Sequence, residues 1–166
     1  MAARGARGSA GGPTVRRVKK EDWDEWLRLR RALWPEGTAE EHTREMAWYT
    51  TSGRGATFVI ERPQGGLGGF VEVSIRPFAD GCRTRPVGYL EGWYVDPDLR
   101  RQGLGTKLVR AAEAWALAQG CREMGSDTQI DNAVSLRAHL ALGFQEVERA
   151  IHFCKPLLPP RAREKE

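Results

Sequence analysis

The sequence predicts one α/β domain in which a mixed β-sheet carries helices on both faces. Strand patterns come first along the chain, followed by the order strand, helix, strand, helix, strand. The 166 residues are enough for one domain with its own core, and neither a repeat nor a linker divides them. We therefore expect a single domain over residues 14–154, with a disordered tail at 1–13 and a flexible tail at 155–166.

The first helix is predicted from its two ends. A short strand over residues 14–18 precedes it. Asp22 is a common N-cap, and Glu25 three residues later would complete a capping box. Pro35 disfavours helical geometry in the residue before it, so the helix should end near Trp34. Apolar residues between these ends recur at helical spacing, which predicts a buried stripe.

A second helix and a hairpin follow. Thr38 can cap a helix that extends over residues 38–49. Residues 56–61 and 68–76 are rich in β-branched and apolar side chains, which is typical of strands. Glycines around residues 64–66 predict the hairpin turn between them. A polar loop over residues 77–86 leads to the next strand.

The rest of the domain alternates strands and helices. The remaining strands are expected at residues 88–95, 121–126 and 144–153. The helices between them are expected at residues 104–119 and 132–142. Asp131 can cap the last helix. Gly120 and Gly143 end the two helices in the left-handed conformation that glycine adopts readily.

A glycine-rich loop joins the strand at 88–95 to the helix at 104–119. Asp96, Pro97 and Asp98 form a turn that ends the strand, and the sequence RRQGLG follows over residues 100–105. The glycines let several backbone N–H groups point outward together, and the helix start adds the positive end of its dipole. The spacing fits neither the phosphate loop of ATPases nor the dinucleotide fingerprint. The loop predicts a pocket for a polyanion, with a pyrophosphate as the natural candidate.

The charge of the chain is divided unevenly. The net charge is +4, but residues 1–20 carry six basic and no acidic side chains, and residues 155–166 carry a net +2. Residues 21–154 therefore carry −4. A nucleic-acid-binding body would show a basic face, so we expect no nucleic-acid partner and a body that suits a cationic substrate.

Other composition features exclude several classes. No apolar run approaches the roughly 20 residues of a membrane helix, so no membrane partner is expected. Three cysteines without metal-type spacing are typical of reduced thiols in a cytoplasmic protein. Three scattered histidines predict no metal site, and no Cys/His/Asp constellation suggests a cysteine nucleophile.

The loop and the last helix carry a family resemblance. Arg-x-x-Gly-x-Gly over residues 100–105, after a strand that contains an acid, resembles the acetyl-CoA loop of the GNAT superfamily of N-acetyltransferases. Residues 132–144 are similar to that family's helix and following Gly-Phe strand, although His139 stands where many members carry a tyrosine that protonates the CoA thiolate. The resemblance covers residues 14–154 and implies a splayed mixed sheet with acetyl-CoA as the donor. The donor-binding residues that it implies are Tyr94, Val95, Arg100, Arg101, Gln102, Gly103, Leu104, Gly105, Thr106, Asn132 and His139.

Shorter motifs narrow the resemblance to aminoglycoside 6′-N-acetyltransferases. They are Leu33-Trp34-Pro35, Tyr89-Leu90-Glu91-Gly92, Gly120-Cys121-Arg122-Glu123-Met124, Ser126-Asp127-Thr128 and Ala141-Leu142-Gly143-Phe144. The resemblance implies acetyl transfer to the 6′-amine of kanamycin- and tobramycin-type antibiotics, and hence resistance to them. It also implies a homodimer, often with exchange of the C-terminal strand.

Two acids are the candidate catalytic residues. An acceptor ammonium has no lone pair, so it must lose a proton before it attacks a thioester, and carboxylates can hold it and relay that proton. Glu91 lies in an otherwise apolar strand, where an acid needs a partner. Asp127 ends the next strand, which should lie parallel to the first and splay from it. Two alternatives stay open: Glu91 as a structural acid bonded to an arginine, and Asp127 as a turn acid.

Further substrate and oxyanion groups are expected near these acids. Trp34 at a helix end is either core or a wall for an aminoglycoside ring, and Asp80 is either a second negative group for a polycation or a solvated surface residue. The thioester oxygen needs a donor, and a backbone N–H near Tyr94 or Val95 is expected to supply it from a β-bulge there.

Three functions remain in competition. The leading one is an aminoglycoside 6′-N-acetyltransferase that uses acetyl-CoA. The second keeps this chemistry but takes a polyamine, another small amine or a protein lysine as acceptor. The third is an acyl-CoA-binding sensor that transfers nothing; the acids at 91 and 127 argue against it.

Overall fold

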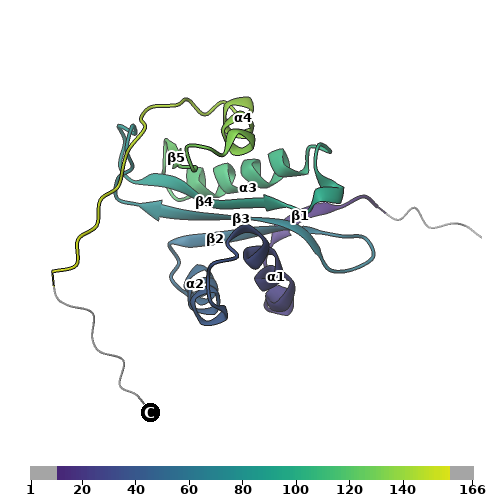
Figure 1. Ribbon diagram of the computed structural model, residues 1–166. Coiled ribbons are helices and arrows are strands. Elements are labelled where there is room, and N and C mark those ends of the chain that lie inside the picture. Colours follow the sequence, from purple (N-terminus) through teal and green to yellow (C-terminus); the bar gives the residue numbers. More distant parts are fainter. Residues whose placement is uncertain (1–10, 158–166) are drawn as a thin grey trace, which may run out of the picture.

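The computed structural model describes residues 11–157 and shows a five-stranded mixed sheet in the order β1-β2-β3-β4-β5 (Figure 1). The strands are β1 (Thr14–Arg17), β2 (Gly55–Glu61), β3 (Leu67–Arg76), β4 (Val87–Val95) and β5 (Met124–Ser126). The first four strands pair antiparallel, and β4 and β5 pair parallel. The predicted mixed sheet is therefore confirmed. The tail residues 1–10 and 158–166 lie outside the described part of the chain.

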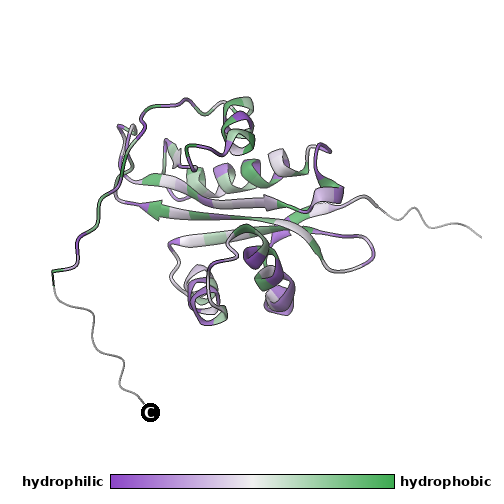
Figure 2. Ribbon diagram, in the orientation of Figure 1, coloured by the Kyte–Doolittle hydropathy of each residue, from purple (hydrophilic) through white to green (hydrophobic). Residues whose placement is uncertain are grey.

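Helices cover both faces of the sheet, as predicted. They are α1 (Trp23–Leu33), α2 (Ala39–Thr51), α3 (Leu104–Ala118) and α4 (Ala133–Ala141), with 3₁₀ turns η1 (Lys20–Asp22) and η2 (Pro97–Leu99). Figure 1 shows α1 and α2 below the sheet, and α3 and α4 above it. One apolar core lies between the sheet and α3, and another lies between the sheet and the α1–α2 pair. Figure 2 accordingly shows hydrophilic colours over much of α1 and α2 and apolar colours along the strands.

The helix caps confirm some predictions and correct others. Thr38 caps α2 and forms a capping box with Glu41. The cap of α4 is Asn132, whose Oδ1 accepts a hydrogen bond from the amide of Ser135, so the prediction of Asp131 is wrong. The predicted box between Asp22 and Glu25 is also wrong, because the Asp22 side chain makes no cap bond to α1.

Asp22 instead holds the N-terminal strand against the turn that precedes α1. Its two carboxylate oxygens accept from Nη1 and Nη2 of Arg16 at 2.6 and 2.9 Å, and Oδ2 also accepts from the Lys19 amide at 2.7 Å. The hydrogen bond from Arg16 lowers the pKa of Asp22 below its ordinary value, against the opposing effect of burial, and the Lys19 amide lowers it further. The ionised form of Asp22 therefore stabilises the fold.

Asp22→Asn is expected to lower the free energy of unfolding by about 1 kcal/mol at neutral pH, because it loses charge-assisted hydrogen bonds. A carboxyl whose pKa is depressed by folding contributes stability above its unfolded pKa of about 3.9, and this stability is lost as the pH falls through the folded pKa. Urea unfolding at pH 7 and below pH 4 measures the difference from wild type. The exposed Asp24→Asn is the control, and a difference that does not narrow at low pH contradicts the assignment.

The strand predicted at residues 144–153 is wrong for this chain. Residues 144–156 adopt neither helix nor strand, and Figure 1 shows them running away from the sheet after α4. A strand forms only where a neighbouring strand supplies hydrogen bonds. The apolar pattern that predicted it remains exposed, with exposed fractions of 63% at Val147, 82% at Ile151 and 92% at Phe153.

Candidate active site

Glu91 is omitted from the pairing between β3 and β4. The register steps from the pair Glu72–Gly92 directly to the pair Val73–Leu90, so Glu91 forms a β-bulge in β4. A bulge bends its strand and re-aims the side chain of the extra residue. This explains how an acid is accommodated in a strand that is otherwise apolar: Glu91 is only half-buried.

The expected bulge at Tyr94 and Val95 is therefore wrong, since both residues pair in regular register with β3. The amide of Asp96 donates to a β3 carbonyl at 2.8 Å. Because amides alternate in direction along an antiparallel ladder, the Tyr94 N–H also points toward β3 and the Val95 N–H points to the opposite edge. On that edge β5 covers β4 only over residues 88–90, so the Val95 amide remains the candidate oxyanion donor.

The carboxylate of Glu91 is bound by two side chains of β3. Arg76 donates from Nε to Oε1 at 2.9 Å and from Nη2 to Oε2 at 2.5 Å. The Ser74 hydroxyl donates to Oε1 at 2.5 Å. Glu91 thus has the arginine partner that its alternative interpretation required, while its half-buried position keeps it accessible to a second cation.

Asp127 is exposed, directly follows β5, and is connected to the same arginine. The phenol of Tyr89 donates to Oδ1 of Asp127 at 2.6 Å. The guanidinium carbon of Arg76 lies 3.3 Å from the centre of the Tyr89 ring, a cation–π contact. Arg76 and Tyr89 therefore join Glu91 and Asp127 into one cluster of two carboxylates and one guanidinium. The positive charge of Arg76 already lies within this cluster.

Sequence reasoning missed the residues that organise this cluster. Ser74 and Arg76 lie two positions apart on β3 and therefore share one face of the strand. That alternation was visible in the sequence, but the pairing of β3 with β4 that brings them to Glu91 was not. Burial, followed by the hydrogen bond to Asp127, raises the pKa of Tyr89, so its phenol stays a proton donor to Asp127.

The structure brings Trp34 to the cluster. A Cβ atom at Gly92 would lie 2.2 Å from Cη2 of Trp34, so the indole packs directly on the residue that follows Glu91. Trp34 is half-buried, which leaves part of its ring exposed. Asp80 is exposed in the loop after β3, and its role in binding a substrate stays a prediction.

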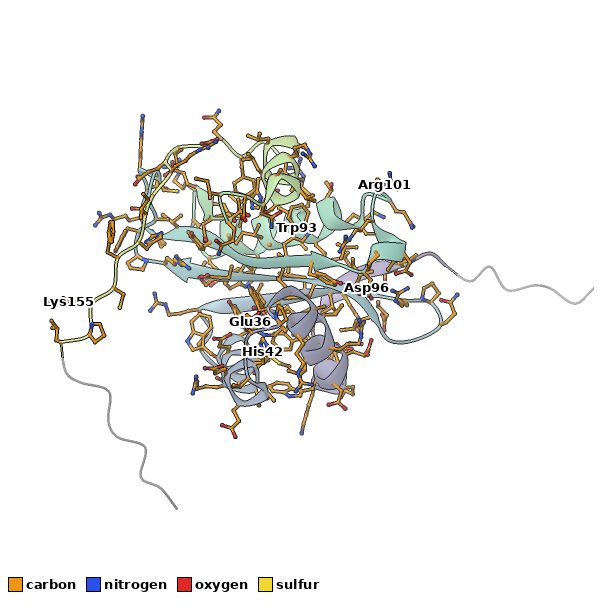
Figure 3. The ribbon with its side chains drawn as sticks, in the orientation of Figure 1. Glu36, His42, Trp93, Asp96, Arg101 and Lys155 are labelled. Atoms are coloured by element: carbon orange, nitrogen blue, oxygen red, sulfur yellow. The ribbon has the colours of Figure 1, made fainter. Side chains whose placement is uncertain are left out.

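The loop before α3 has the backbone turn that a polyanion site needs. Arg101 has φ +59° and Gly103, the N-cap of α3, has φ +75°. The first amides of the 15-residue helix α3 therefore open at the tip of this loop, where the helix dipole is positive. Figure 3 shows Arg101 at that tip.

The side chains of the other predicted loop residues differ from one another in burial and in hydrogen bonding. Leu104 is buried in the core under α3, so only its backbone can serve a ligand. The Nε of Arg100 donates to the Val95 carbonyl at 2.8 Å, and the Gln102 amide donates to the Asp98 carbonyl at 2.9 Å. Thr106 is exposed in the first turn of α3.

Ion pairs brace the start of this loop. Asp96, only 8% exposed, lies 3.2 Å from Nη2 of Arg28 and 3.0 Å from Nη2 of Arg62. Arg62 also binds Asp98 at 2.7 Å. These contacts tie the turn after β4 to α1 and to the end of β2, so the loop starts from a fixed position. Figure 3 labels Asp96 at this start and Arg101 at the tip. No pattern in the sequence predicted this pairing.

Trp93 lies between the loop and α4. A Cβ atom at Gly105 would lie 2.8 Å from Cζ2 of Trp93 and 3.2 Å from its Nε1, so a glycine is needed for this close approach. The Nε1 atom is buried and has no hydrogen-bond partner in the part of the chain that the structure describes. Buried donors are rarely left unpaired, so this N–H has unused hydrogen-bonding capacity beside the loop.

His139 is held at the end of β5. Its Nδ1 lies 2.8 Å from the Ser135 carbonyl, so Nδ1 carries a hydrogen, and Nε2 lies 2.9 Å from the Ser126 hydroxyl. The imidazole meets the Trp93 ring edge-on with centroids 5.9 Å apart. His139 and Trp93 therefore form one polar and aromatic wall where β4 extends beyond β5.

A separate hollow lies away from these groups. It has a volume of about 670 Å³ and is lined by Arg17, Val18, Lys19, Lys20, Trp23, Tyr49 and Thr50, none of which was predicted as a site residue.

Within residues 11–157, no cluster of three or more His, Cys, Asp or Glu side chains could hold a metal ion. No described helix is long and apolar enough to cross a membrane.

The sheet, the parting of β4 from β5 and the loop at the start of α3 define the class of acyl-CoA-dependent N-acetyltransferases. The chain belongs to the acetyltransferase (GNAT) family, which it matches over residues 23–144. It is 48% identical over 149 residues to the aminoglycoside N(6′)-acetyltransferase type 1 of Klebsiella aerogenes, covering 87% of this chain and 97% of that protein. The enzyme of the same name from Stenotrophomonas maltophilia is 38% identical, with 90% and 97% covered.

Solved structures agree with this relationship. The aminoglycoside acetyltransferase AAC(6′)-Iy, in complex with the bisubstrate analogue CoA-S-monomethyl-acetylneamine, superposes with a TM-score of 0.83 at 35% identity and covers 88% of this chain and 99% of its own. AAC(6′)-Ih from Acinetobacter baumannii gives the same TM-score, identity and coverage. The predicted family and fold are thus confirmed.

Proposed function

We propose that this protein transfers the acetyl group of acetyl-CoA to the 6′-amino group of aminoglycosides, and so confers resistance to them. The observation that carries the proposal is the cluster in which Glu91 and Asp127 are joined through Arg76 and Tyr89, with Glu91 on the strand that leads into the loop before α3. Two carboxylates against one guanidinium leave a net negative site, which attracts a polycation. The names of the similar proteins support the same acceptor.

In this mechanism the chain supplies charge, orientation and proton transfer. Glu91 and Asp127 hold the acceptor ammonium, and one of them takes its proton or relays it to water. Acetyl-CoA supplies the thioester. As the amine nitrogen bonds to the carbonyl carbon, the Val95 N–H donates to the carbonyl oxygen, which becomes negative. The C–S bond then breaks, and as the amide forms the acceptor nitrogen loses its extra proton, which balances the proton that the departing thiolate takes up.

A coupled thiol assay tests this function. The protein is incubated with acetyl-CoA and kanamycin or tobramycin, and CoA release is followed with a thiol reagent. Release with 6′-amino compounds, and none with an analogue that carries a 6′-hydroxyl, is the expected result. Preference for spermidine over every aminoglycoside would favour the polyamine alternative. Calorimetric CoA binding without transfer to any amine would show an acyl-CoA sensor.

Trp93→Phe is expected to act in opposite directions on stability and donor binding. The change keeps an aromatic ring and deletes an N–H that is buried without a partner, so the free energy of unfolding without ligand should rise by about 1 kcal/mol. The same N–H is free to bind the donor, so the Kd of CoA should increase about fivefold. Thermal unfolding and calorimetry measure the two effects. Equal CoA affinity in both proteins contradicts the role of Trp93.

The C-terminal segment suits a homodimer with strand exchange. Val147, Ile151, Phe153 and Leu157 are exposed apolar residues on a segment without a strand partner in the described chain. A second copy can supply that partner and bury these side chains. Light scattering of the full chain is expected to give twice the monomer mass of 18.6 kDa. A monomer at micromolar concentration overturns the dimer.

We also infer that the protein works in the cytoplasm. Cys82, Cys121 and Cys154 are unpaired in the described chain, and unpaired cysteines suit a reducing compartment. Fractionation of the producing cells tests this compartment, and recovery of the protein from the periplasm would overturn it.

A further inference from the structure

A buried ion pair that the mechanism does not use lies under the acceptor site. Arg30 of α1 and Glu72 of β3 are 2% and 1% exposed. The Nη1 of Arg30 donates to both oxygens of Glu72, and the Trp26 indole donates to Oε1 of Glu72 at 2.9 Å. Arg30 also pairs with Glu45 of α2. Figure 3 labels His42, which lies in the α1–α2 layer beneath the sheet and also contacts Arg30.

Stability alone is a weak reason for this pair. Burial of two charges commonly costs as much as their attraction returns, and apolar replacements of similar volume are often equally stable. Burial raises the pKa of the Glu72 carboxyl to about 7, although Arg30 lowers it. The network therefore holds its side chains in a defined arrangement at a cost in folding free energy. The other contacts of Arg30 show which neighbouring group this arrangement holds in place.

The network converges on Trp34. The guanidinium carbon of Arg30 lies 4.7 Å from the centre of the Trp34 ring, and the Arg30 Nε donates to Nδ1 of His42 at 3.3 Å. An arginine can only donate, so Nδ1 accepts and the hydrogen of His42 is on Nε2. That Nε2 donates to the Trp34 carbonyl at 3.2 Å. Arg30 and His42 thus hold the ring and the backbone of the same residue.

The held ring presses on the strand that carries Glu91. Trp34 contacts Gly92 so closely that a Cβ atom there would lie 2.2 Å away, and Gly92 pairs across the sheet with Glu72. Glu72 thus binds Arg30, and Arg30 contacts the Trp34 ring. That ring packs on Gly92, the residue that pairs with Glu72. A shift of Arg30 would move the indole relative to the neighbouring Glu91.

We propose that Arg30, fixed by Glu72 and His42, is a positioning residue that sets the affinity for the acceptor by holding the Trp34 indole beside Glu91. This inference rests on the proposed function and on the predicted role of Trp34 as a wall for an aminoglycoside ring. Arg30 is buried behind Trp34 and does not touch the acceptor. Lysine at this position would keep the charge opposite Glu72 but lose both the flat cation on the ring and the donor to His42.

A double-mutant cycle between Arg30→Lys and Trp34→Ala tests the proposal. Arg30→Lys is expected to raise the KM of tobramycin about tenfold and leave the KM of acetyl-CoA unchanged. In the Trp34→Ala background the same change should have no further effect, because the residue through which it acts is missing. The exposed neighbour Arg31→Lys is the matched control and should change neither KM.

The possible outcomes separate this inference from the proposed function. Wild-type protein that acetylates no aminoglycoside overturns both. Wild-type activity with equal effects of Arg30→Lys in the two backgrounds, or with parallel rises in both KM values, overturns the positioning role alone. If Arg30→Lys does not fold, His42→Phe is carried through the same cycle, since it breaks the contacts with Arg30 and with the Trp34 carbonyl. Additive effects of that variant would overturn the proposal equally.

Discussion

Asp127→Asn is expected to lower kcat for an aminoglycoside acceptor by about 10²–10⁴-fold, the usual contribution of a positioned acid–base group. Asparagine keeps the shape of the side chain and an oxygen that can accept the hydrogen bond from Tyr89, which is 2.6 Å long in the wild type. It cannot take a proton from the acceptor amine or balance its charge. The loss should therefore appear in turnover, and the fold should remain unchanged.

Steady-state kinetics with thiol detection measure this loss. The KM of acetyl-CoA should stay constant, because the loop before α3 is untouched. Asp131→Asn is the control, since Asp131 is another exposed acid a few residues later, and its activity should equal that of wild type. Wild-type turnover by Asp127→Asn would restrict Asp127 to the turn role that the sequence also permitted.

Features governed by local chemistry were predicted well from the sequence. Thr38 caps α2 as predicted, because the backbone amide that its side chain binds lies within the first turn of the helix. Gly120 and Gly143 adopt φ +87° and +92°, as the ends of α3 and α4 require. The loop at residues 100–105 combines glycines, basic residues and a helix start in one short segment, so its turn could be predicted without the fold.

Features governed by competition between distant groups were not predicted. Asp22 could cap α1, but its carboxylate instead accepts hydrogen bonds from Arg16 and from the Lys19 amide. The bulge at Glu91 depends on how β3 pairs with β4, because a residue is extra only in relation to the strand opposite it. The strand expected at residues 144–153 has the right apolar pattern, but a strand also needs a neighbouring strand, and none of the described strands pairs with this segment.

The candidate site divides along the same line. Glu91, Asp127 and Trp34 carry conspicuous chemistry for their positions in the sequence, and the structure brings all three to one region. Arg76 and Arg30, which hold them, look like ordinary surface arginines in the sequence. Their partners are supplied by other strands and helices, so only the tertiary structure could identify them.

Glu91→Gln is expected to lower kcat/KM for aminoglycosides by about 100-fold and to weaken its dependence on salt. In the wild type the two negative charges of Glu91 and Asp127 exceed the single positive charge of Arg76. The variant leaves one negative and one positive charge, so the net attraction to a polycation is lost. Kinetics at low and high ionic strength measure the effect. Glu61→Gln is the control, because Glu61 is a carboxylate bonded to an arginine at the far edge of the sheet. An unchanged kcat/KM would mean that Glu91 serves only to hold Arg76, and the acceptor ammonium would then be bound by Asp127 alone.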